Sequence, residues 1–176
     1  MTRKELAKAI YDVSHLTGTF TLRSGAVSNE YFDKYLFEAQ PHILKAIAEH
    51  MAQLLPEGAQ VLAGLEMGGI PIATALSFET ELPAAFVRKE AKKYGTAKIA
   101  EGTALENKRI VVVEDVVTSG GQVILSAADL RGLGANIMCA VCVIDRESGG
   151  KEKLAAEGIE LRALFTMSEL KEATGV

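Results

Sequence analysis

Short apolar runs alternate with amphipathic segments along most of the chain, and this alternation predicts the fold. The strand-like runs are centred near Ala63, Phe86, Val112, Ala140 and Arg162. Their spacing leaves room for a helix between one strand and the next, as a parallel sheet requires. The pattern therefore predicts an α/β fold with a central parallel sheet and helices on both faces.

Other segments lie outside this alternation. Residues 2–14 carry apolar side chains at helical spacing, Pro41 opens a second amphipathic stretch, and Thr166 with Glu169 forms a capping-box start for a terminal helix. Residues 18–33 indicate an extended or hairpin element, and an edge strand of the main sheet is the alternative.

The most informative stretch is a buried strand that runs into two acids. Residues 110–113 are consecutive apolar β-formers, and Glu114 and Asp115 follow directly. Such a run is typical of a strand buried on both faces. Carboxylates at its C-terminal end are tolerated where the chain reaches the surface, and in an open α/β sheet ligands bind at that edge. We therefore expect the chemistry there.

Hydroxyls and glycines follow the acids and predict a phosphate cradle. The sequence Thr118-Ser119-Gly120-Gly121 leads into a helical pattern from Val123, which aims backbone N–H groups and a helix N-terminus at one point. The spacing fits neither a Walker loop nor a Rossmann fingerprint. Two carboxylates beside a phosphate site suit a ribose phosphate, because they can accept hydrogen bonds from its hydroxyls. An ordinary polar turn is the alternative, but the combination favours binding.

Two other loops carry features of a binding site. Gly68 and Gly69 follow a predicted strand, and the sequence favours a tight turn with positive φ over a second anion loop. Residues 88–98 are rich in lysine and arginine. Such a run is usually a solvated surface. However, the whole connection, 88–109, has a length that tends to be functional, and a basic lid could neutralise a departing pyrophosphate.

Composition limits the function classes. The chain has 176 residues, enough for one core and too few for two ordinary domains, so we expect a single domain, 1–176, with its core sheet in 60–165. The net charge of -4 argues against nucleic acid as a partner. No apolar run approaches the roughly 20 residues of a membrane span, and the N-terminus has no signal core. We expect a cytoplasmic protein with no membrane partner.

The cysteines and histidines add no predicted site. Cys139 and Cys142 are three apart in a strand pattern, so they point to opposite faces and cannot share a metal. We expect two buried, inert thiols. His15, His42 and His50 have no clustered partners in the sequence and are expected to be surface or packing residues.

Four motifs resemble those of a known family. Residues 111–121, Val-Val-Val-Glu-Asp-Val-Val-Thr-Ser-Gly-Gly, are similar to the signature with which type I phosphoribosyltransferases bind 5-phosphoribosyl 1-diphosphate (PRPP). Residues 20–31, Phe-x-Leu-x-Ser-Gly-x-x-Ser-x-x-Tyr, resemble the hood segment of orotate phosphoribosyltransferases. Arg88-Lys89-x-x-Lys92 and Asp145-Arg146 resemble motifs of the same family. The resemblance covers nearly the whole chain.

The resemblance implies a reaction and a set of roles. Orotate and PRPP give orotidine 5′-monophosphate and pyrophosphate in de novo pyrimidine synthesis, with Mg²⁺ bound mainly through PRPP and no side chain assigned to the metal. The implied catalytic residues are Lys92, Glu114 and Asp115. The implied PRPP-binding residues are Arg88, Lys89, Lys92, Tyr94, Glu114, Asp115, Val116, Val117, Thr118, Ser119, Gly120, Gly121 and Gln122. Thr118 and Arg146 are implied for orotate.

The resemblance also implies an architecture. It predicts a type I phosphoribosyltransferase-like fold with a small N-terminal hood, in which residues 1–40 recognise the base. Residues 88–109 would form a mobile basic lid that acts in trans across a homodimer, and the turn at Gly68 would face the pyrophosphate. Arg23 stands where some relatives use a lysine to contact PRPP. The alternatives are a phosphoribosyltransferase for a purine and a non-catalytic PRPP-sensing regulator of transcription. The basic segment and the negative net charge disfavour the regulator.

Overall fold

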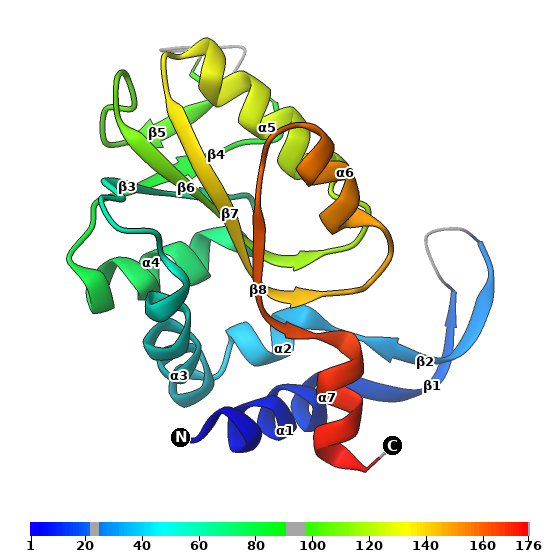
Figure 1. Cartoon of the computed structure of the whole chain (residues 1–176). Coiled ribbons are helices and arrows are strands. Elements are labelled where there is room, and N and C mark those ends of the chain that lie inside the picture. Colours follow the sequence, from blue (N-terminus) through cyan, green and yellow to red (C-terminus); the bar gives the residue numbers. More distant parts are fainter. Residues whose placement is uncertain (22–24, 91–97, 176) are drawn as a thin grey trace.

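The computed structural model describes residues 1–21, 25–90 and 98–175 and builds them around a six-stranded sheet (Figure 1). The strands of this sheet are β3 (Val61–Leu65), β4 (Ala84–Val87), β5 (Ala100–Gly102), β6 (Arg109–Val117), β7 (Asn136–Asp145) and β8 (Leu161–Thr166). A separate hairpin consists of β1 (His15–Thr21) and β2 (Val27–Phe32). The helices are α1 (Arg3–Ser14), α2 (Lys34–Glu38), α3 (Pro41–Met51), η1 (Ala52–Leu54), α4 (Gly69–Thr80), α5 (Gly121–Gly132), α6 (Gly150–Ala156) and α7 (Met167–Thr174).

The strand order confirms the predicted fold class. The strands lie in the order β5-β4-β3-β6-β7-β8, and all neighbours pair in parallel except β4 and β5, which are antiparallel. This edge strand lies inside the segment 88–109 that we predicted as a lid. It was not predicted, because Ala100-Glu101-Gly102 has no apolar run. Strand β6 lies in the interior of the sheet, so its C-terminal end is flanked by β3 and β7. In open α/β sheets, ligands bind at this edge.

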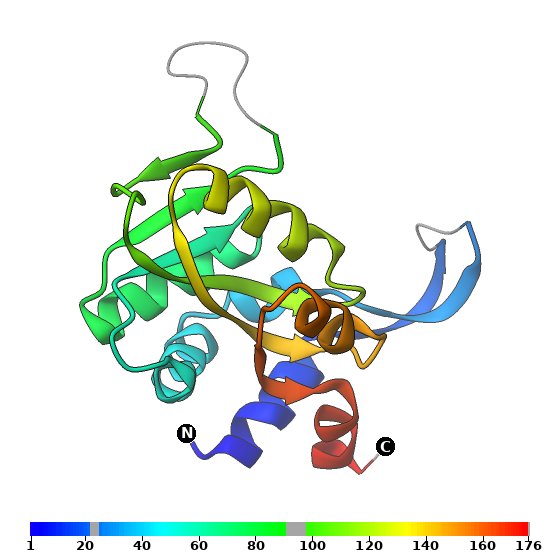
Figure 2. The same cartoon turned by 45° about the horizontal axis from the view of Figure 1, so that its top comes forward.

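Helices cover both faces of the sheet (Figures 1 and 2). An apolar core lies on each face. Alternate residues of β6 enter each core: Val111 and Val113 pack against α1, α3 and α4, whereas Val112 faces α5 and α6. Cys139 and Cys142 likewise lie in different cores, and both thiols are free and buried. Burial raises the pKa of Cys139 to about 11. The prediction of two buried thiols on opposite faces is confirmed.

The N-terminal segment forms a hairpin that projects from the body (Figure 2). Among the described residues, β1 and β2 pair with each other and not with the central sheet, so the alternative of an edge strand is wrong. The hairpin leads through Asp33, whose side chain caps α2 by accepting from the Tyr35 N–H, into a helix that the sequence reading missed. Phe37 of α2 is fully buried and anchors this helix to the core.

The described helices include none with both the length and the apolar character that crossing a bilayer requires.

Candidate active site

The loop after β6 encloses a cavity at the carboxyl edge of the sheet. Gly120 has a φ of 75° and caps α5, and its carbonyl accepts from the Ile124 N–H at 3.0 Å. This left-handed backbone favours glycine and leaves the first N–H groups of α5 without helical partners. The cavity has a volume of about 350 Å³ and is lined by Glu114, Val116, Val117, Thr118, Ser119, Gly120, Gly121, Gln122 and Val123. Every loop residue predicted for phosphate binding therefore lines one cavity, which suits an anion.

The start of α6 supports this loop from outside. A Cβ atom at Gly150 would lie 2.6 Å from the Thr118 carbonyl oxygen and 2.8 Å from Val117 Cγ1. A larger residue would therefore push the loop out of place, because contacts this short are not tolerated between fixed backbone atoms. The loop is therefore held by packing as well as by its own glycines.

The two acids lie within β6, not beyond it, because the strand continues to Val117. Adjacent strand residues face opposite sides. Glu114 lines the cavity, whereas Asp115 is 0% exposed. Asp115 Oδ1 accepts from the Val116 N–H at 2.6 Å, so this acid fixes the first residue of the loop.

Lys34 and Glu38 of α2 gather around Asp115. The two residues are four apart on the helix and share a face. Lys34 Nζ lies 2.6 Å from Asp115 Oδ2, and Glu38 is 8% exposed. The sequence reading missed both, since nothing local connects residues 34–38 with residue 115.

Burial and hydrogen bonding distribute the protons of this cluster. Burial, then the close approach of the Asp115 carboxyl group, raises the pKa of Glu38 to about 9 and holds the pKa of Glu114 well above its ordinary value. Burial also acts to raise the pKa of Asp115, but the close contacts with Glu114 and with the Lys34 ammonium outweigh it, and that pKa is lowered. Asp115, whose pKa is lowered, thus faces the Lys34 ammonium, with Glu38 neutral near pH 7 beside it.

Glu38→Gln is expected to change how stability depends on pH. The folded pKa of Glu38, about 9, exceeds the ordinary value of 4.5, so its contribution is complete below the lower value and is lost as pH rises through the upper one. Between about pH 6 and 8, the free energy of unfolding of the parent should fall relative to the variant by about 1.4 kcal/mol per pH unit. Urea unfolding across this range measures the difference, and parallel curves would contradict the raised pKa.

The turn between β3 and α4 packs directly on the acids. Gly68 has a φ of -70°, so the predicted need for positive φ is wrong. Instead, a Cβ atom at Gly68 would lie 1.6 Å from Asp115 Oδ2, and one at Gly69 would lie 2.3 Å from the Val113 carbonyl oxygen. Glycine is required here because two backbone segments and a carboxylate approach each other closely.

The basic segment begins at the same edge of the sheet. Arg88 follows β4, and its Nε is buried without a hydrogen-bond partner among the described residues. The Lys89 N–H donates to Glu66 Oε1 at 2.5 Å, which ties the segment to the β3–α4 turn. Three of the residues discussed from the sequence lie outside the described part of the chain: Arg23, Lys92 and Tyr94.

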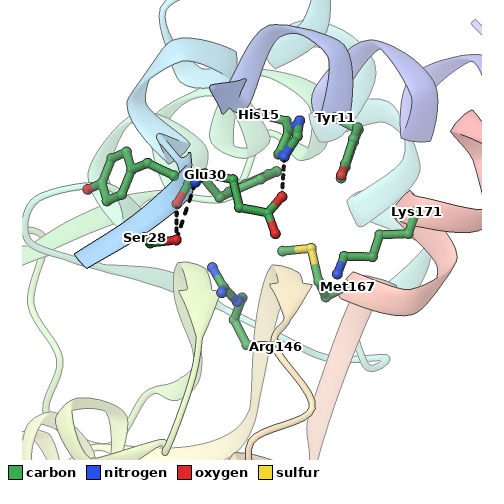
Figure 3. Close-up of a pocket in the computed structure, with 9 residues that line it drawn as sticks. Tyr11, His15, Ser28, Glu30, Arg146, Met167 and Lys171 are labelled. Atoms are coloured by element: carbon green, nitrogen blue, oxygen red, sulfur yellow. Dashed lines mark hydrogen bonds and ion pairs between the residues drawn. The ribbon is translucent and has the colours of Figure 1, made fainter. Parts of the chain in front are cut away.

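A second cavity, of about 290 Å³, lies between the hairpin, the end of β7 and α7 (Figure 3). Arg146 points from the end of β7 toward Ser28 and Glu30 of the hairpin, and Lys171 reaches in from α7. Glu30 Oε2 lies 2.6 Å from His15 Nε2. The remaining lining residues are Tyr11, Tyr31, Phe32 and Met167. Aromatic rings with two cationic side chains suit a flat, anionic ligand.

The sequence placed Arg146 and Thr118 on one crevice, and the structure separates them. Arg146 lines the hairpin cavity and Thr118 the loop cavity. The cavities are neighbours, because the Arg146 N–H donates to the Val117 carbonyl at 2.9 Å. The parallel strands β6 and β7 bring the two residues to the same edge of the sheet, but their side chains line different cavities.

Comparisons with known proteins agree with this geometry. The family model described as "Phosphoribosyl transferase domain" matches residues 36–163. An orotate phosphoribosyltransferase of a Nocardioides species is 50% identical over 168 residues, which cover 96% of this chain and 94% of that protein. The chain belongs to the orotate phosphoribosyltransferase family. The orotate phosphoribosyltransferase of Methanocella arvoryzae is 44% identical over 87% of both chains. The crystal structure of Mycobacterium tuberculosis H37Rv orotate phosphoribosyltransferase in complex with PRPP superposes with a TM-score of 0.83 at 27% identity, covering 96% of this chain and 98% of that one.

Membership of the orotate phosphoribosyltransferase family confirms the resemblance, but the sequence reading missed part of the hairpin cavity. His15 was expected to be a surface or packing residue, yet it lines this cavity and pairs with Glu30. Tyr11 stacks on the His15 ring at a centroid distance of 4.8 Å. The available signal was weak: Tyr11 and His15 are four residues apart at the end of a predicted helix, which places them on one side.

Proposed function

We propose that this chain transfers the 5-phosphoribosyl group of PRPP to orotate, giving orotidine 5′-monophosphate and pyrophosphate in pyrimidine synthesis. The observation that carries the proposal is the pair of neighbouring cavities at the carboxyl edge of β6 and β7. One is lined by backbone N–H groups and Glu114, and the other by Arg146, Lys171 and aromatic rings. The first suits a sugar phosphate and the second a planar carboxylate. The names of the relatives support the same substrates.

Each part of the site takes a role in glycosyl transfer. The anomeric carbon gains oxocarbenium character as pyrophosphate departs and an orotate nitrogen attacks. Glu114 would contact the ribose hydroxyls from the cavity wall, and residues 116–122 would hold the 5-phosphate. The ionised Asp115 would fix the loop and place negative charge near the ring, where it stabilises developing positive charge.

Magnesium would reach the site with PRPP. Among the described residues, no three or more His, Cys, Asp or Glu side chains lie close enough together to hold a metal ion. The ion would be bound mainly by the phosphate oxygens of PRPP. Bound there, Mg²⁺ would neutralise charge on the leaving pyrophosphate. Arg88 and Lys89, with Lys92 and Tyr94 further along the segment, would contact the same group from the protein side.

We also propose the domain organisation, the basic lid and the homodimer that the sequence predicts. The chain would act as one cytoplasmic domain, with residues 1–40 recognising the base and 88–109 forming the basic lid. The motif Arg88-Lys89-x-x-Lys92 resembles the basic signature of orotate phosphoribosyltransferases, in which this loop reaches across a dimer into the neighbouring active site. By that resemblance, the lid would act in trans in a homodimer. The edge strand β5 pairs with β4 and so holds residues 100–102 of this segment to the sheet.

An absorbance assay tests which base accepts the phosphoribosyl group. Purified protein with PRPP, Mg²⁺ and orotate should consume orotate, and the same mixture with adenine or hypoxanthine should give no nucleotide. Turnover of a purine without turnover of orotate would identify a purine enzyme instead. Binding of PRPP without any turnover would identify a regulator.

Replacing Arg146 by alanine is expected to raise the KM for orotate about tenfold or more, because hydrogen bonds to charged groups are worth about 1.5–3 kcal/mol. The KM for PRPP should change little, since Arg146 does not line the loop cavity. Steady-state kinetics with each substrate varied separate the two constants. Arg131→Ala, on the exposed side of α5, is the matched control, and an unchanged KM for orotate in Arg146→Ala would reject the assignment.

A further inference from the structure

The cluster around Asp115, beside the loop cavity, contains two residues that have no role in the proposed reaction. Lys34 and Glu38 lie at the two ends of α2, which begins two residues after the hairpin strand β2 ends. Lys34 is about one-third exposed at 34%, whereas its partner Asp115 is fully buried. Ion pairs on the surface contribute little, but breaking a pair that leaves a buried charge alone is strongly unfavourable.

Asp115 is shielded from the cavity by its protein partners. Oδ1 accepts from the Val116 N–H at 2.6 Å, and Oδ2 lies 2.6 Å from Lys34 Nζ. Glu114 lines the cavity and Asp115 does not. The acid is therefore placed to act on the loop through Val116 more than on a ligand directly.

Glu38 completes the enclosure of this carboxylate. Neither Glu38 Oε1 nor Asp115 Oδ2 accepts a hydrogen bond from the described residues, so the Lys34 contact is an ion pair and a proton on Glu38 would supply the missing donor. Both oxygens lie close to Gly68 in the β3–α4 turn, because a Cβ atom added at Gly68 would lie 1.6 Å from Asp115 Oδ2 and 2.8 Å from Glu38 Oε1. The cluster thus joins α2, β6 and this turn at one point.

We propose that Lys34 and Glu38 are positioning residues that hold Asp115, and through it the first residue of the phosphate loop, in the geometry that PRPP binding requires. This inference rests on the proposed function. Lys34 supplies the charge that keeps the buried carboxylate in place, and Glu38 supplies the hydrogen bond on its other side.

Lys34→Met keeps most of the side-chain length and removes the charge. We expect kcat/KM for PRPP to fall about a hundredfold, as misplacement of a binding group by about 1 Å can cause. The KM for orotate should stay within about threefold of the parent, because Lys34 does not line the hairpin cavity. Lys34→Arg should restore most of the lost activity, since it restores the positive charge.

Lys45→Met is the matched control. Lys45 lies on α3, its side chain is 76% exposed, and its ion pair with Glu49 spans 3.8 Å, so the variant should keep parental constants. A Lys34→Met protein that keeps the parental kcat/KM for PRPP would overturn the proposal. An equal loss for both substrates without rescue by arginine would also overturn it, because that pattern indicates general damage to the fold.

Glu38→Gln provides a second readout, in pH. The amide can donate to Asp115 as the protonated acid does, so kcat/KM for PRPP near pH 7 should stay close to the parental value. The charged groups that act on Glu38 are Asp115, Lys34 and Asp33, and Glu114 acts on the cluster through Asp115. As the pH approaches 9, the parent should lose kcat/KM for PRPP while Glu38→Gln retains it, because ionised Glu38 would repel Asp115.

The outcomes separate the inference from the proposed function. Identical pH profiles for the parent and Glu38→Gln would overturn the role of Glu38. If the parent itself does not convert orotate and PRPP, the proposed function fails before any variant is compared. If the parent is active and the variants behave as the parent does, the inference fails alone.

Discussion

Replacing Lys92 by alanine is expected to lower kcat by about 10²–10³-fold, the range seen when a group that stabilises transition-state charge is removed. The pyrophosphate carries its full charge only as the bond to the anomeric carbon breaks, so a lid lysine acts mainly in the transition state. The KM for orotate should change by less than about threefold, because Lys92 is not implied in base binding. Steady-state rates at saturating PRPP and orotate give the measurement.

Lys108→Ala is the control for this experiment. Lys108 is exposed at the far end of the same connection, just before β6, and its loss should leave kcat unchanged. An unaltered kcat in Lys92→Ala would reject the catalytic role of the basic segment while leaving the assignment of the two cavities intact.

Mixing variants tests whether the lid acts in trans. Lys92→Ala carries an intact sugar cavity, and Glu114→Ala carries an intact lid. If the lid reaches across a homodimer, an equal mixture that exchanges subunits should recover about one quarter of the parental activity, because half of the dimers then hold one complete site of two. A lid that acts within its own subunit would leave every site in the mixture defective, and no activity would return.

Gly69→Ala is expected to lower the free energy of unfolding by about 3 kcal/mol, the upper part of the usual range for overpacking. The new Cβ atom would lie 2.3 Å from the Val113 carbonyl oxygen and 3.3 Å from Glu114 Cα, and neither backbone atom can rotate away. For a chain of this size the melting temperature should fall by about 6–12 °C. Because the displaced turn packs on the strand that carries both acids, the KM for PRPP should rise as well.

Gly132→Ala is the paired control for backbone substitution. Apart from its chain neighbours and the backbone of its own helix, no described atom lies within 4 Å of the added Cβ at this position near the end of α5, so the same chemical change meets open space. It should stabilise the chain by about 0.5–1 kcal/mol, as alanine does relative to glycine in a helix. Thermal and urea unfolding of both variants measure the contrast, and equal effects would refute the close-approach argument for Gly69.

The phosphate loop was predictable because its parts are contiguous. A buried run of valines, two acids, hydroxyls, paired glycines and a helical pattern follow one another between residues 110 and 130, so local rules for strands, turns and helix starts suffice. The same rules gave the parallel sheet, and the opposite faces of Cys139 and Cys142 followed from the two-residue period of a strand. They also placed Arg146 at the edge of the sheet where ligands bind.

The partners of these residues were not predictable, because they come from distant segments. Lys34 meets Asp115 across 81 positions of sequence, and the packing of Phe37 into the core helps to hold α2 beside β6. His15 and Glu30 meet because the hairpin closes in one particular register. Local patterns carry no information on such contacts, since they depend on how whole elements pack.

The sequence by itself determined the α/β fold, the loop that can hold a phosphate and the strand edge where the chemistry belongs, because each depends on neighbours along the chain. Only the tertiary structure decided that Arg146 and Thr118 line two separate cavities, that Gly68 and Gly69 are required by close approach and not by positive φ, and that Asp115 is buried against Lys34 and Glu38. These features arise where separate elements press together, and their energies come from burial and from charges in a low dielectric, which exist only once the chain has folded.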